Sequence, residues 1–151
     1  MPHSIRPVTE ADKARWVELL NAYAVFYKTS VPDGGHERVW AWIMDPQNDF
    51  WCDLSSDDTG SIIGFTQYQL MHRSLSGEMV CYLSDLFVEP AVRGTGYGRA
   101  LIDHVISFAK ARKIPNVRWL TQDYNYAGRR LYDTYTVKSD FILYSLPISA
   151  D

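Results

Sequence analysis

The apolar positions of the chain follow two periods, and the change between them predicts the order of its elements. Residues 3–8 favour a short edge strand, and apolar residues at every third or fourth position then predict a helix over 10–27. A second, shorter helix ends before Pro46, because a proline disfavours helical backbone in the residue that precedes it. Turn residues then separate three strand-like runs, which cover 50–55, 61–71 and 78–88.

The second half of the chain alternates between the helical and the extended pattern. The expected elements are a helix over 97–112, a strand over 117–121, a helix over 126–135 and a final strand over 141–146. The resulting order is β-α-α-β-β-β-α-β-α-β. It predicts an α/β (α+β) fold, in which helices cover both faces of one mixed, mainly antiparallel sheet.

Composition and charge narrow the class of protein. The 151 residues are 46% hydrophobic, and with no linker or internal repeat we expect a single domain over 1–151. The formal net charge of −3 gives no reason to expect nucleic acid or a membrane surface as a partner. No window approaches the roughly 20 apolar residues of a membrane span, so we expect a cytoplasmic protein. Cys52 and Cys81 lie in apolar runs without the spacing of a metal site, so we expect no metal.

A basic, glycine-rich loop carries the first chemical information. The strand that ends at Pro90 is followed by Arg93-Gly94-Thr95-Gly96-Tyr97-Gly98-Arg99 and then by an amphipathic helix. Glycine permits positive φ and a close approach of the backbone to a ligand. Loop N–H groups and a helix N-terminus bind anions, and the two flanking arginines can neutralise phosphates. The loop therefore predicts a phosphate-binding site.

Two nucleotide-binding patterns fail on the residues of this loop. A Walker loop ends in Gly-Lys-Ser/Thr, whereas Gly98 is followed by Arg99-Ala100. A dinucleotide fingerprint needs a third glycine at the sixth position, where counting from Gly94 reaches Arg99. The loop also follows an antiparallel meander rather than the first strand of a parallel βαβ unit. A nucleotide-binding module is therefore disfavoured.

Three segments together resemble the GNAT acyltransferase superfamily. Arg93-x-x-Gly96-x-Gly98 is similar to its acyl-CoA-binding loop, and Tyr82–Pro90 is similar to its fourth strand. Asn125, Ala127, Leu131 and Tyr132 are similar to the later helix that bears the catalytic tyrosine, with one residue more between Ala127 and Tyr132 than in the family's pattern. Within the superfamily the chain is similar to the small polyamine/histone-type and spermidine/spermine-type amine acetyltransferases.

The resemblance implies transfer of an acetyl group from acetyl-CoA to a primary amine by direct attack in a ternary complex. The acceptor would be a polyamine, an amino acid, another small amine or a protein lysine, and a homo-oligomer, a dimer, would be expected. Tyr132 would act as general acid, and Asn125 would cap its helix or contact the pantetheine. The CoA-binding residues would be Leu86, Phe87 and Val88, at a bulged strand edge, and the loop residues Arg93, Gly94, Thr95, Gly96, Tyr97, Gly98 and Arg99.

The acceptor side of the reaction is less specified. Asp85 is the carboxylate best placed to manage protons, and the glutamate that precedes it in the spermidine/spermine type is replaced by Ser84. Asp85 can act through a water, attract the cationic amine, or bond the backbone at the bulge. Tyr23, Phe26 and Tyr27 either wall the substrate cleft or pack in the core. A non-catalytic acyl-CoA-binding regulatory domain is the alternative function.

Overall fold

The computed structural model describes residues 3–150, which divide into two compact units at the Leu120–Thr121 bond. The first unit contains β1 (Ser4–Pro7), the 3-10 turn η1 (Glu10–Asp12), α1 (Lys13–Phe26), α2 (Gly35–Met44), β2 (Phe50–Ser56), β3 (Ile62–Arg73), β4 (Glu78–Val88), the 3-10 turn η2 (Pro90–Val92), α3 (Tyr97–Ala111) and β5 (Val117–Arg118). The second unit contains one helix, α4 (Tyr126–Tyr132), within its described residues.

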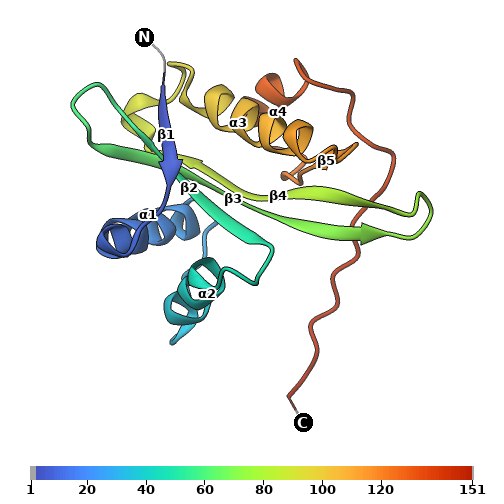
Figure 1. Ribbon diagram of the computed structural model, residues 1–151, viewed down its shortest axis with the longest axis horizontal. Coiled ribbons are helices and arrows are strands. Elements are labelled where there is room, and N and C mark those ends of the chain that lie inside the picture. Colours follow the sequence, from blue (N-terminus) through green and yellow to red (C-terminus); the bar gives the residue numbers. More distant parts are fainter. Residues whose placement is uncertain (1–2, 151) are drawn as a thin grey trace. The chain divides into compact units, whose positions relative to one another are not determined.

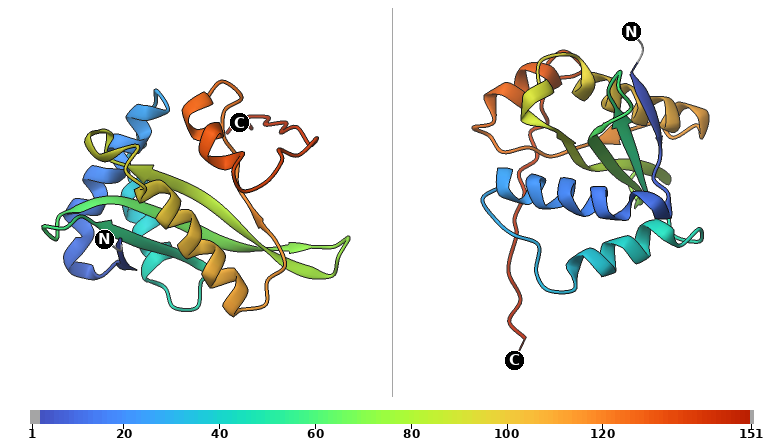
Figure 2. Two further views of the ribbon diagram at one scale, coloured as in Figure 1. Left: turned by 90° about the horizontal axis from the view of Figure 1, so that it is seen from above. Right: turned by 90° about the vertical axis from the view of Figure 1, so that its left-hand side faces the viewer.

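The sheet of the first unit follows the order of the chain, β1-β2-β3-β4-β5. The first four strands pair antiparallel, and β5 pairs parallel to β4 only at Cys81 and Tyr82. Helices α1 and α2 cover one face of this sheet and α3 covers the other (Figures 1 and 2). The mixed, mainly antiparallel sheet with helices on both faces was the arrangement expected from the sequence.

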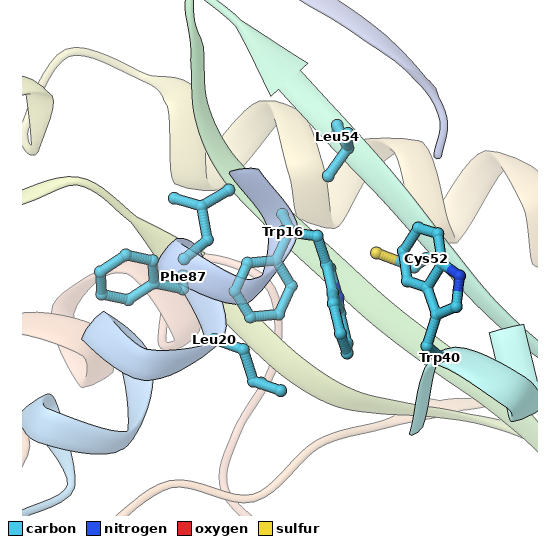
Figure 3. Packing of buried hydrophobic residues seen from close by; sticks show 8 residues of the cluster. Trp16, Leu20, Trp40, Cys52, Leu54 and Phe87 are labelled. Carbon is cyan, nitrogen blue, oxygen red and sulfur yellow. The ribbon is translucent and has the colours of Figure 1, made fainter. Parts of the chain in front are cut away.

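Strand alternation divides the core of the first unit between the two faces of the sheet. Because successive side chains point to opposite faces, Cys52, Leu54 and Phe65 face α1 and α2. There they pack with Trp16, Leu19, Leu20, Trp40 and Phe87 (Figure 3). Ile63 and Val88 pack instead with Leu101 of α3. Burial of each such side chain stabilises the fold by about 1.5–3 kcal/mol, so both helical layers are held on the sheet.

Three expected elements differ from those observed. The strand expected over 117–121 is reduced to β5, and the helix expected over 126–135 ends at Tyr132. The final strand expected over 141–146 is wrong, because residues 137–150 form no regular structure and their apolar side chains are exposed. A strand needs a neighbour for its backbone N–H and C=O groups, and the described residues pair no strand with this segment. The last β of the expected order is therefore absent.

Candidate functional site

A β-bulge in β4 shapes the site. Gln67 of β3 pairs with Asp85, but the next residue, Tyr68, pairs with Leu83, so Ser84 is the extra residue in β4. A bulge leaves its extra residue out of the ladder and re-aims the neighbouring side chains. The Ser84 hydroxyl accepts a hydrogen bond from Gln69 Nε2 at 2.9 Å. The structure thus confirms the bulge expected in this strand.

Asp85 lies at the centre of a hydrogen-bonded chain of side chains. Gln67 Nε2 donates to Asp85 Oδ2 at 2.7 Å, and Trp16 Nε1 donates to Gln67 Oε1 at 2.9 Å. The Tyr23 hydroxyl donates to the same carboxylate and is also hydrogen-bonded to Tyr27. The carboxylate of Asp85 is therefore held by side chains from α1 and β3 rather than by the backbone of the bulge.

Burial sets the electrostatics of this chain. It raises the pKa of Asp85 above its ordinary value, and the hydrogen bonds from Gln67 and Tyr23 oppose that rise. Burial also raises the pKa of Tyr23, and the adjacent Asp85 charge raises it further, so the phenol remains a proton donor at neutral pH. Asp85 is consequently a stronger base than a solvated aspartate, and its neighbours keep it in one orientation.

Asp85 opens into a pocket of about 500 Å³ in the first unit. Its wall is formed by α1, loop residues 29–32, α2, β2, β3 and the bulge of β4. Tyr23 and Tyr27 line this pocket, and Ser84 borders it beside Asp85. Phe26 does not line it; its ring lies under the Arg93 guanidinium instead, with 5.1 Å between the guanidinium carbon and the ring centroid.

The sequence analysis did not single out Gln67 and Arg38, which are among the residues that line the pocket. Gln67 is buried in an apolar strand, and only its pairing opposite Asp85 reveals its role. Arg38 lines the pocket from α2, although the helical spacing alone predicts that it lies on the solvent-exposed face of that helix. Both depend on contacts between distant parts of the chain, so neither carried a local signal.

The glycine loop has the geometry expected of an anion site. Gly94 and Gly96 adopt φ of +80° and +95°, which side chains with a Cβ rarely do. Gly96 directly precedes α3, whose intrahelical bonding begins with Ala100 N to Gly96 O at 3.0 Å. The N–H groups of Tyr97 and Gly98 therefore have no acceptor within the helix. They point out of the N-terminus of α3, where the helix dipole favours an anion.

Arg93 is partly engaged by the end of β4. Its Nε donates to Val88 O at 2.9 Å, and its guanidinium lies over the Phe26 and Phe87 rings. Its Nη groups are those left to meet an anion. Thr95 donates its hydroxyl to Val92 O, which closes the loop.

The end of β4 presents an open edge. In the described residues, β5 pairs only with Cys81 and Tyr82, so the strand beyond them has no partner on that side. Glu89 N donates to Ile63 O at 2.8 Å, and facing pairs alternate along an antiparallel ladder. The N–H groups of Leu86 and Val88 therefore point away from β3, whereas the N–H of Phe87 points toward it. Of the three residues named from the resemblance, Leu86 and Val88 offer backbone donors, and Phe87 contributes its buried ring.

In the second unit, Asn125 and Tyr132 stand at the two ends of α4. Asn125 caps the helix, because its Oδ1 accepts from Gly128 N at 3.3 Å while its Nδ2 donates to Thr121 Oγ1 at 2.9 Å. A Cβ on Gly128 would lie 2.5 Å from Asn125 Nδ2 and 3.1 Å from Tyr132 Cε2. Because α4 runs unbroken to Tyr132, Gly128 lies three residues after Asn125 and next to the Tyr132 ring.

The described residues contain no group of three or more His, Cys, Asp or Glu side chains arranged to hold a metal ion. Nor does any helix among residues 3–150 have the length and apolar character needed to cross a membrane.

Comparisons with known proteins agree with the geometry. The D-amino-acid N-acetyltransferase HPA3 of Saccharomyces cerevisiae is 34% identical over 141 residues, covering 93% of this chain and 88% of that protein. The uncharacterized N-acetyltransferase YhfO of Bacillus subtilis is 28% identical over 149 residues, covering 97% of this chain and 99% of that protein.

Solved structures share the fold. Ribosomal-protein-alanine N-acetyltransferase from Brucella melitensis biovar Abortus 2308 superposes with a TM-score of 0.80 at 20% identity, covering 97% of this chain and 99% of that one. A probable acetyltransferase superposes with a TM-score of 0.83 at 22% identity, covering 98% and 99% of the two chains. A model of the acetyltransferase (GNAT) family matches residues 16–135. The chain therefore belongs to the GNAT family of acetyltransferases.

Proposed function

We propose that this enzyme transfers the acetyl group of acetyl-CoA to the amine of a free amino acid. The observation that carries the proposal is Asp85: a carboxylate of raised pKa, held at a strand bulge, opening into a pocket and lying in the part of β4 that has an open edge. The relative HPA3 is a D-amino-acid N-acetyltransferase, which supports amino acids over the other amines. The similarity to polyamine- and histone-type enzymes stays a prediction from the sequence.

The fold supplies groups suited to acetyl-CoA. We propose that the N–H groups of the 94–99 loop bind its pyrophosphate, with the Nη groups of Arg93 beside them. The outward N–H groups of Leu86 and Val88 would bond the pantetheine arm and the thioester carbonyl. From the resemblance, Tyr132 would protonate or hydrogen-bond the departing sulfur, and Asn125 would position its helix.

Asp85 would manage the charge of the acceptor. An alkylamine of pKa near 10.4 is protonated at pH 7, and making it neutral costs about 4–5 kcal/mol. A carboxylate attracts the ammonium form and accepts its proton, and the raised pKa of Asp85 makes this transfer less uphill. Ser84, which stands where the spermidine/spermine type has a glutamate, cannot share that role because a hydroxyl is not a base at neutral pH.

Two features of organisation belong to the same proposal. The family model spans residues 16–135 and so crosses the boundary at Leu120, which supports one catalytic domain over 1–151. A homodimer is supported by the exposed apolar side chains near the C-terminus, namely Val137, Phe141, Ile142, Leu143, Tyr144, Leu146 and Ile148.

A panel of acceptors tests the proposed function. Release of free CoA would be followed spectrophotometrically with acetyl-CoA and, one at a time, D- and L-amino acids, spermidine and a lysine-containing peptide. We expect one or more free amino acids to be acetylated with a higher kcat/KM than spermidine or the peptide. Turnover confined to spermidine or the peptide would contradict the proposal that the acceptor is an amino acid. Binding of CoA without turnover of any acceptor would instead support a regulatory domain.

A further inference from the structure

The pocket around Asp85 contains one acidic and one basic residue among the described residues that line it. The acid is Asp85, from the bulge of β4, and the base is Arg38, from the N-terminal part of α2. The remaining lining is aromatic, aliphatic or neutral and polar. A pocket with one charge of each sign, supplied by two different elements, matches a ligand that itself carries one charge of each sign.

Arg38 has hydrogen-bonding capacity to spare. Its Nη1 approaches only the carbonyl oxygen of Asp33, at 3.5 Å, and it forms no ion pair within residues 3–150. The basic residues around α1 differ, since Arg6, Lys13 and Arg15 each pair with a carboxylate. A guanidinium carries five N–H donors in a planar fork that matches a carboxylate.

We propose that Arg38 binds the α-carboxylate of the acceptor while Asp85 holds its amine, so that the pocket selects zwitterionic α-amino acids. This inference rests on the proposed function and adds to it the residue that recognises the carboxylate. It also assigns a place to the side chain of the amino acid. Val39, Trp42 and Phe50 line the same pocket and provide an apolar surface, which fits an aliphatic or aromatic side chain.

The same arrangement disfavours polyamines. A spermidine bound through one amine at Asp85 would bring a second cation toward Arg38, and the described lining offers no second carboxylate to receive it. Repulsion between Arg38 and the second cation of a polyamine would therefore select against that ligand. An amine without a carboxylate would leave Arg38 unused and lose only the attraction that Arg38 provides.

A matched pair of acceptors isolates the role of Arg38. Phenylalanine, assayed as each enantiomer, and phenethylamine differ only in the carboxylate. The Arg38→Met variant is expected to lower kcat/KM for the acetylated enantiomer by about 10- to 100-fold, the range of a lost charge-assisted hydrogen bond. Its kcat/KM for phenethylamine should change less than about twofold. The Arg38→Lys variant should fall between wild type and Arg38→Met, because it keeps the charge and loses the fork.

The ratio of the two kcat/KM values is the readout. It is independent of the fraction of folded enzyme, so a loss of stability in a variant does not obscure it. Arg73→Met is the matched control: it removes the same charge from the β3–β4 hairpin, outside the pocket lining, and should leave the ratio unchanged. Arg38→Glu should reverse the preference and raise kcat/KM for spermidine relative to phenylalanine.

Failure of this inference is distinguishable from failure of the proposed function. Suppose that wild type acetylates phenylalanine and that Arg38→Met lowers kcat/KM for phenylalanine and phenethylamine equally, or lowers neither. Arg38 then does not bind the carboxylate, while the proposed function stands. If wild type acetylates phenethylamine or spermidine but no amino acid, the amino-acid acceptor and the role of Arg38 are both overturned.

Discussion

Asp53 and Asp85, two aspartates of the sheet, differ in their partners, although both border a pocket. Asp53 of β2 is 4% exposed, and its Oδ2 accepts from the Tyr68 hydroxyl at 2.5 Å and contacts His104 Nε2 at 2.7 Å. Asp85 of β4 receives hydrogen bonds from the neutral side chains of Gln67 and Tyr23. Strand alternation directs Asp53 toward α3 and Asp85 toward α1.

The difference is why we assign Asp53 a structural role and propose a catalytic role for Asp85. The Tyr68 hydroxyl and the His104 ring both bond the Asp53 carboxylate, so the fold itself supplies the partners of Asp53, which ties α3 to the sheet. Asp85 has no cationic partner among the described residues, and its burial is offset only by neutral donors. In the proposed function, the amine of the substrate would supply the cation that Asp85 lacks. The predictions below test this distinction.

The largest effect is expected from Asp85→Asn. The amide keeps the shape of the carboxylate but cannot hold an ammonium group or accept its proton. We expect kcat/KM for the amino-acid acceptor to fall by about 10²- to 10⁴-fold in steady-state assays of CoA release. Asp53→Asn is the matched control, and its kcat/KM per folded molecule should stay within a few-fold of wild type. Equal losses in the two variants would abolish the distinction.

Asp53→Asn should lower stability instead. The substitution removes a charged acceptor shared by Tyr68 and His104, and we expect a loss of about 1–3 kcal/mol in the free energy of unfolding. Chemical denaturation followed by circular dichroism at pH 7 measures it. A variant as stable as wild type would show that Asp53 does not tie α3 to the sheet.

A smaller effect is expected from Tyr23→Phe. It removes a hydrogen bond that lowers the pKa of Asp85, so that pKa should rise further and the acid limb of the pH–activity profile should move to higher pH. Activity at pH 7 should fall by a few-fold. Tyr68→Phe, which removes the corresponding phenol from Asp53, should leave the limb in place. A limb that moves equally in both variants would contradict the assignment.

The smallest effect concerns the stability of Asp85→Asn across pH. A carboxyl whose pKa is raised by folding stabilises the protein below its unfolded pKa of about 3.9, and this contribution is lost as the pH rises through the folded value. The Asn variant does not lose it. Its stability relative to wild type should therefore increase from acid to neutral pH, as measured by denaturation at several pH values. A constant difference would show that the pKa of Asp85 is not raised.

Local sequence signals predicted much of the fold. Helical spacing located α1, α2 and α3, and the turns located β2, β3 and β4 to within two residues at each end. The positive φ of Gly94 and Gly96 agrees with the backbone conformation expected for a glycine-rich loop that binds an anion. The strand expected over 141–146 failed because strand formation depends on a partner, and apolar alternation does not supply one.

The pocket around Asp85 was less predictable for a related reason. Asp85 was identified by its place in a strand, but its contact with Gln67 depends on register and bulge, which are non-local. Arg38 lies 47 residues away along the chain from Asp85, in a helix whose pattern records only which face is buried. The sequence therefore predicted residues for the acetyl-CoA side of the site, whereas the charge pattern of the pocket around Asp85 came from the structure.

The pH dependence of kcat/KM in wild type and in Asp85→Asn tests the central claim most directly, namely that ionised Asp85 handles the amine. Wild type should lose activity as the pH falls through an apparent pKa above the ordinary aspartate value of about 3.9, and the low residual activity of Asp85→Asn should lack that limb. An acid limb that persists unchanged in Asp85→Asn would contradict the account.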